Sequence, residues 1–135
     1  MYLCIYNLYN MKDLHRLTLR YELSRLTIRR ENNLTVNAVA SLLSTERNFS
    51  VHNMMEYLTA CEKQLEITDW MGETWRATST QDLHDMIGKL LDKSRRRLSD
   101  MNNTIQVTYT SKALSIDTLL KVLGYFKCKL DIINI

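Results

Sequence analysis

One pattern of hydrophobic and polar positions occurs twice in this chain. The segments SVHNMMEYLTACEKQLEI (50–67) and SIDTLLKVLGYFKCKLDI (115–132) align without a gap, 65 residues apart, and share Ser, Leu, Leu and Ile. Four more positions exchange similar residues: Val for Ile, Met for Leu twice, and Glu for Asp. Each copy opens with a serine before apolar residues at helical spacing, which is typical of a capped amphipathic helix. The sequence therefore predicts one helical building block written twice.

The same periodicity predicts helices elsewhere in the chain. They are expected over 12–30, 36–44 and 50–64, from a capping box at 79–82 onward to residue 98, and from Ser115 onward. Each start coincides with a polar residue that is able to cap a helix, except the first. The chain is therefore expected to be mostly helical.

Shorter runs favour strands. LEITDW and TWRATS flank Met71-Gly72 and predict a hairpin, and LDIINI predicts a short strand at the C-terminus. The segment 99–114 stays open between helix and strand, because Ser99 can cap a helix while TIQVTYT alternates as a strand does.

The predicted helix over 12–30 has apolar residues on two opposite faces. One face holds Leu14, Leu17, Tyr21 and Ile28, and the other holds Leu19, Leu23 and Leu26. Since a surface helix buries a single face, this helix is expected either between the two repeats or against a second copy of the chain, as a homodimer. The alternation from Leu17 to Leu23 also allows a strand.

The composition excludes several classes of protein. The chain has 135 residues, 45% of them hydrophobic and 24% charged, which fits one ordinary domain or two very small ones. Its three cysteines lack C-x-x-C spacing and indicate neither a disulfide framework nor a zinc site. The apolar start MYLCIYNLYNM is too short to span a bilayer and lacks the features of a signal peptide. A cytoplasmic protein without a membrane anchor is expected.

Residues 34–79 show the order helix, polar turn, capped helix and hairpin. This stretch resembles winged helix-turn-helix DNA-binding domains, and residues 81–132 resemble them more loosely. SKAL and the SIDTLLKVLGYFKCKLDI that follows it are also similar to the closing helices of repressor-type helix-turn-helix antitoxins. The resemblance implies an α+β, mostly α, protein of tandem winged-helix-like helix-turn-helix repeats with short β-hairpins, divided into 1–78 and 79–135. In such domains the second helix enters the major groove of DNA.

The positive charge lies mainly in the second half of the chain. Residues 1–70 contain 8 Lys and Arg against 8 Asp and Glu, whereas residues 71–135 contain 10 against 7. The run KSRRRL indicates either a solvated helix end or a phosphate clamp formed by Lys93, Arg95, Arg96 and Arg97. On and around the second copy of the helix, this surface is extended by Lys112, Lys121, Lys127 and Lys129.

Other residues are candidates for reading DNA bases. Thr118 and Lys121 are expected at base edges if the second copy of the helix faces the duplex. In the first copy, Asn53 suits adenine and Arg47 suits phosphate, while Arg76 on the predicted hairpin is placed to reach a groove.

These features together predict a non-catalytic protein that binds double-stranded DNA as a small transcription regulator or accessory factor, without a cofactor or metal. Its composition is typical of a phage or mobile-element product. No metal-ligand spacing, nucleophile elbow or phosphate-binding loop occurs in the sequence, which argues against an enzyme. The alternative is an adaptor that binds and inhibits a host protein through the repeat surface and through Trp70 and Trp75, which favour core or interface positions over base stacking.

Overall fold

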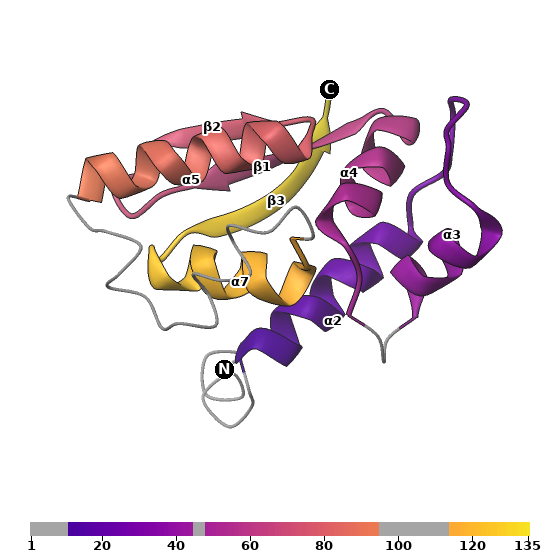
Figure 1. The fold of residues 1–135 in the computed structure, drawn as a ribbon, viewed down its shortest axis with the longest axis horizontal. Helices are drawn as coiled ribbons and strands as arrows, with labels where there is room; N and C mark the ends of the chain where they lie inside the picture. The colour runs from indigo at the N-terminus through magenta and orange to yellow at the C-terminus, as the bar shows by residue number, and fades with distance from the viewer. Residues whose placement is uncertain (1–10, 45–47, 95–113) are drawn as a thin grey trace.

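The chain folds into helices packed on an antiparallel sheet (Figure 1). The computed structural model describes residues 11–44, 48–94 and 114–135, with side chains from residue 17 onward. Within these residues the helices are α2 (Met11–Ser24), α3 (Val36–Leu43), α4 (Val51–Ala60), α5 (Thr80–Ser94) and α7 (Ile116–Tyr125). The strands are β1 (Lys63–Thr68), β2 (Thr74–Ala77) and β3 (Lys129–Asn134). The predicted class, α+β and mostly helical, is confirmed.

Polar caps begin the helices where the sequence predicts them. Thr35 Oγ1 accepts a hydrogen bond from the Ala38 amide, and Ser79 Oγ accepts one from the Asp82 amide, both at 3.1 Å. Asp82 in turn accepts a hydrogen bond from the Thr78 amide at 2.9 Å. That backbone hydrogen bond is the main reason why the pKa of Asp82 is lowered, and it ties the strand β2 to the start of α5.

The sheet has the strand order β2-β1-β3, with both pairs antiparallel. The strands β1 and β2 form the predicted hairpin, in which Leu65 lies opposite Ala77 and Thr68 lies opposite Thr74. The predicted terminal strand β3 is also confirmed, and it pairs with β1 along the whole length of both strands. The first and the last β-leaning segments of the described chain therefore share one hydrogen-bonded ladder.

The two copies of the duplicated segment are related by a local two-fold axis. Adding or subtracting 65 converts the pairs from Gln64–Ile133 to Thr68–Lys129 into pairs of the same ladder, as Leu65–Ile132 becomes Leu130–Ile67. The central pair, Glu66 opposite Asp131, converts into itself and so lies on the axis. A repeat found in the sequence is therefore also a repeat in three dimensions.

The starts of α4 and α7 meet on the same axis. Ser50 and Ser115 form an isolated antiparallel bridge, and each caps its own helix by accepting a hydrogen bond from the amide three residues on. The bridge has two backbone hydrogen bonds: Val51 N–H donates to Leu114 O at 2.9 Å, and Ile116 N–H donates to Phe49 O at 2.8 Å. A shift of 65 residues converts each of these hydrogen bonds into the other. The two helices therefore have the same cap and bridge hydrogen bonds at their N-termini.

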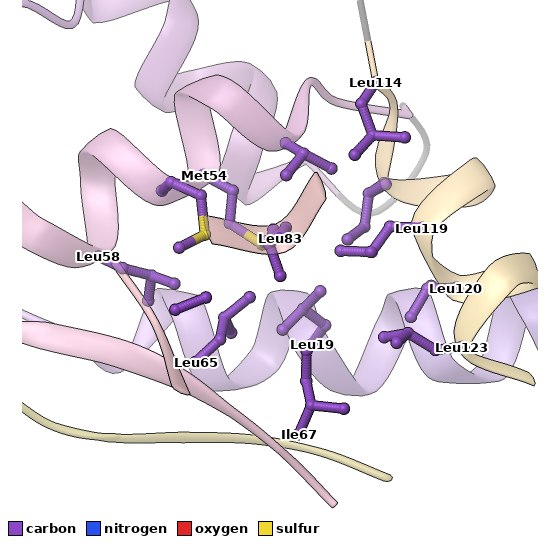
Figure 2. Close-up of a cluster of buried hydrophobic side chains, with 14 of the residues drawn as sticks. Leu19, Met54, Leu58, Leu65, Ile67, Leu83, Leu114, Leu119, Leu120 and Leu123 are labelled. Atoms are coloured by element: carbon purple, nitrogen blue, oxygen red, sulfur yellow. The ribbon is translucent and has the colours of Figure 1, made fainter. Parts of the chain in front are cut away.

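Equivalent apolar side chains from both copies meet in one core (Figure 2). Leu58 and Leu123 are equivalent, and so are Met54 and Leu119; all four are at most 3% exposed. Leu19 of α2 lies among them in Figure 2. Burying a leucine or methionine side chain contributes about 1.5–3 kcal/mol, so this shared core is the main reason why the two copies stay together.

The first described helix differs from its prediction. α2 ends at Ser24 rather than at residue 30, and the strand alternative for Leu17 to Leu23 is wrong because these residues are helical. The segment after α2 is held by α4 instead of continuing the helix: Tyr57 Oη donates to Leu23 O at 3.1 Å, and the amides of Arg29 and Arg30 donate to Ala60 O. Tertiary hydrogen bonds here outweigh helical propensity.

The two apolar faces of α2 have different environments. Leu19 and Leu23 are buried against the core, where α2 packs on α7 and α3. Leu17 is 46% exposed and Tyr21 is 61% exposed, so among the described residues only one face is covered. The homodimer expected through residues 12–30 stays a prediction.

The helix predicted over 50–64 is four residues too long. It ends at Ala60 because Glu62 adopts a positive φ of 60°, and Lys127 does the same with a φ of 53° at the equivalent point after α7. Neither Glu62 nor Lys127 is a glycine or asparagine, the usual residues at such a position, so no turn signal marks these ends. None of the helices in the described part of the chain combines the length and apolarity needed to span a lipid bilayer.

Candidate nucleic-acid interface

The outer side of α4 is partly covered by the segment that precedes α3. The Asn33 amide donates to Glu56 Oε1 at 3.3 Å, and Ala60 O accepts from two backbone amides of the same segment, at 2.7 and 3.0 Å. Thr59 Oγ1 is bonded to Thr78 O at 3.3 Å. Although α4 is the helix that the winged-helix resemblance assigns to the groove, several of its outward polar groups are already engaged.

The outer side of α7 is more open. Lys121 and Gly124 are exposed, and a Cβ placed at Gly124 meets nothing within 4 Å. Lys127 follows the end of the helix and is also exposed. None of these lysines has an ion pair among the residues that the structure describes. A polyanion could therefore approach this side of α7 closely.

The two equivalent segments carry opposite charge. Where the first copy has Glu56, Glu62 and Gln64, the second has Lys121, Lys127 and Lys129. Residues 50–67 contain three glutamates and one lysine, a formal charge of −2, while residues 115–132 contain two aspartates and three lysines, a formal charge of +1. The shared scaffold therefore presents an acidic version and a basic version of one surface.

Two of the predicted base-reading residues take part in helix capping. Thr118 is only 8% exposed, and its hydroxyl lies 3.1 Å from Ser115 Oγ, within the cap of α7. Asn53 is half-buried, and its backbone N–H donates to Ser50 Oγ at 3.0 Å. Little of the Thr118 side chain is accessible for a base edge, whereas Lys121 stands on the open side of the same helix.

Lys93 belongs to a network of ion pairs. Its ammonium group lies 2.6 Å from Asp69 Oδ2 and 2.6 Å from Glu73 Oε2. These hydrogen bonds raise the pKa of Lys93, that from Asp69 most. Because two carboxylates already neutralise the charge of Lys93, we expect its attraction for a phosphate to be weak.

Asp69 is the centre of this network. Its side chain is fully buried and accepts hydrogen bonds from the amides of Met71 and Glu73, from Trp75 Nε1 and from Lys93 Nζ. Burial by itself raises the pKa of Asp69, but these hydrogen bonds outweigh it and lower the pKa to about 2. The network fixes the turn between β1 and β2 against the C-terminal end of α5.

The remaining predicted contacts have different outcomes. Arg76 on β2 is exposed, and its Nε lies 3.3 Å from Glu66 Oε2, an exposed type of pair that contributes little to stability. Arg47, Lys112 and the clamp residues Arg95, Arg96 and Arg97 lie outside the described residues. The division into 1–78 and 79–135 stays a prediction, with the ladder of β1 and β3 joining strands from both parts.

A pocket that the sequence did not indicate lies next to Lys93. It is about 390 Å³ in volume, and its lining comes from three separate segments: Trp70, Lys93, Ser94, Tyr125, Phe126 and Lys127. Figure 1 shows the C-terminal ends of α5 and α7 at the same end of the molecule, which brings these segments together. Periodicity could not reveal this pocket, because it depends on the long-range pairing of β3 with β1.

No family model, curated protein or solved structure matches this chain.

Proposed function

We propose that this protein is a non-catalytic DNA-binding protein, a small transcription regulator or accessory factor, and that α7 and the turn after it form the contact surface. The observation that supports this most is the replacement of Glu56 and Glu62 by Lys121 and Lys127 at equivalent points of one scaffold. Packing does not require the exchange, because all four side chains lie outside the core. It does give one copy the charge that phosphates attract.

The order of elements also supports a winged-helix origin. α3 packs on α4, and the β1–β2 hairpin follows directly, as in the domains that residues 34–79 resemble. Under this proposal the first unit acts as the scaffold, because its outward groups are engaged by residues such as Asn33 and its charge is negative. The second unit then makes the contact, with Lys121 beside the open surface of Gly124.

A salt titration tests the proposal. Binding of a fluorescein-labelled blunt duplex of arbitrary sequence is followed by fluorescence anisotropy from low to physiological salt. Each phosphate contact lowers log K by about 0.9 per unit of log salt, so the double variant Lys121→Ala/Lys127→Asn should flatten the slope by about 1.8. Asparagine is chosen at 127 because it tolerates the positive φ at that position.

The matched control is Arg25→Ala/Arg29→Ala, which removes the same charge from an exposed segment beside the C-terminal end of α4. We expect this control to keep the wild-type slope. An equal loss in both double variants would refute the assignment to α7, and a wild-type affinity that does not respond to salt would refute DNA binding itself.

The alternative function, an adaptor for a host protein, is supported by the outer face of α2. Leu17 and Tyr21 are exposed there on one side of a helix whose other side is buried. Exposed apolar residues of this kind are typical of protein contacts. An adaptor would lose partner binding in Leu17→Ser/Tyr21→Ser and keep it in Lys121→Ala/Lys127→Asn, as co-purification with each variant would measure.

A further inference from the structure

The pocket between α5 and α7 has an aromatic wall. Trp70 and Phe126 stack with ring centroids 6.2 Å apart and an interplanar angle of 23°, and Tyr125 meets Phe126 edge to face at 5.2 Å. Phe126 is buried, whereas Trp70 is 39% exposed. The indole ring therefore packs against Phe126, and Trp70 also lines the pocket.

The position of Trp70 is fixed by its neighbours before any ligand binds. Asp69, the preceding residue, is held by the buried network described above, and the Lys93 ammonium lies 5.4 Å from the centroid of the Trp70 ring. Lys93 therefore acts as a positioning residue for the wall, since its charge is already paired with carboxylates. A rigid aromatic platform loses little conformational entropy on binding a flat ring.

The two-fold relation shows that an equivalent backbone carries different side chains at these positions in the first copy. The residues equivalent to Tyr125, Phe126 and Lys127 are Ala60, Cys61 and Glu62, on a backbone that ends its helix in the same way and turns through the same positive φ. Two small residues and an acid are thus replaced by two aromatic rings and a base. Within the described residues, the second copy therefore contributes two aromatic side chains and the exposed Lys127 to the pocket lining.

We propose that this pocket binds an unpaired nucleobase, stacked on Trp70, with the adjoining phosphate near Lys127. Aromatic platforms next to basic side chains are the usual means of holding single-stranded nucleic acid. The proposal rests on the proposed function and adds to it that the protein prefers DNA with a single-stranded portion.

Two single-tryptophan variants test the stacking directly. Trp75→Phe leaves Trp70 as the one indole of the chain, and Trp70→Phe leaves Trp75, whose indole N–H is bonded to Asp69. A blunt duplex and the same duplex with a few unpaired adenines are titrated into each protein. The overhang should quench Trp70 and leave Trp75 unchanged, because a stacked base contacts only the indole that forms the wall.

The affinities provide a second readout. Stacking of one base contributes enough that the overhang duplex should bind at least about fivefold more tightly than the blunt duplex. This preference should disappear in Trp70→Ala and be smaller in Trp70→Phe, which keeps a ring. Circular dichroism checks that both variants are folded, and Trp70→Phe keeps the test valid if the alanine variant is not.

Each outcome decides between the proposals. Equal affinity for both duplexes without quenching overturns the pocket proposal and leaves DNA binding intact. Binding of the free adenine strand with quenching, but not of the blunt duplex, supports the pocket and overturns duplex binding. No binding of any nucleic acid overturns both. Tighter binding of an acidic, tyrosine-containing peptide than of the overhang would overturn the proposal and make the pocket a protein-binding site.

Discussion

Replacing Asp69 by asparagine tests how much the buried network at the β1–β2 turn contributes to stability. The amide can place its oxygen where Oδ1 now accepts from the Met71 and Glu73 amides. Its NH₂ group then faces the two donors that Oδ2 now satisfies, Trp75 Nε1 at 3.1 Å and Lys93 Nζ at 2.6 Å. The variant therefore keeps the hydrogen bonds of the turn. On the buried side, however, its NH₂ group meets two other donors and no acceptor.

Two independent estimates give the same magnitude for this change. Leaving a buried donor without an acceptor costs about 1–3 kcal/mol. Separately, the pKa of Asp69 falls from 3.8 to about 2 on folding. One pKa unit corresponds to about 1.4 kcal/mol, so the ionised carboxylate stabilises the fold by at most about 2.5 kcal/mol. We expect Asp69→Asn to lose about 2 kcal/mol of the free energy of unfolding at neutral pH.

The direction in which the free energy of unfolding changes with pH identifies the contribution of Asp69. Because its folded pKa is depressed, its stabilisation is complete above about pH 4 and is lost as the pH falls toward about 2. Urea unfolding followed by tryptophan fluorescence should show this loss in the wild type and a smaller loss in Asp69→Asn. The control Glu73→Gln removes an exposed partner of Lys93 and should cost less than about 1 kcal/mol. A wild type and Asp69→Asn of equal stability at neutral pH would refute this account of the turn.

Two further predictions use the internal symmetry. Ser50→Ala and Ser115→Ala each remove a cap and should each cost about 1 kcal/mol in urea unfolding; a large difference between them would show that the caps are not equivalent. Lys127→Gly should relieve the positive φ, which adds about 1 kcal/mol to the free energy of unfolding and raises the thermal midpoint. The same change at Glu62 should stabilise the protein less, because the ion pair of Glu62 with Arg30 is lost. A lower midpoint for Lys127→Gly would contradict this reasoning.

The local elements of this fold could be predicted from the sequence because their signals are local. Thr35, Ser50, Ser79 and Ser115 all cap helices, and the hairpin follows from two β-leaning runs around Gly72, which has a φ of 83°. Such signals depend on residues within a few positions of one another. The repeat at a spacing of 65 also correctly indicated two equivalent building blocks.

The features that could not be predicted from the sequence depend on contacts between distant residues. Nothing in residues 24–30 marks the end of α2, because the segment is held by Tyr57 and Ala60, more than thirty positions away. The partner of β3 could not be identified from its own residues either. The ion pair between Lys93 and Asp69 also joins distant residues, and a count of charges does not show it.

The two-fold axis within a single polypeptide has a consequence for how its surface can vary. In a dimer of identical subunits, every substitution appears on both sides of the axis. A new lysine therefore always adds a positive charge to both halves. Here the halves are covalently joined and encoded separately, which leaves one free to become basic while the other keeps its glutamates. At the axis the two copies face each other directly, where Glu66 lies opposite another acid, Asp131, and forms an ion pair with Arg76.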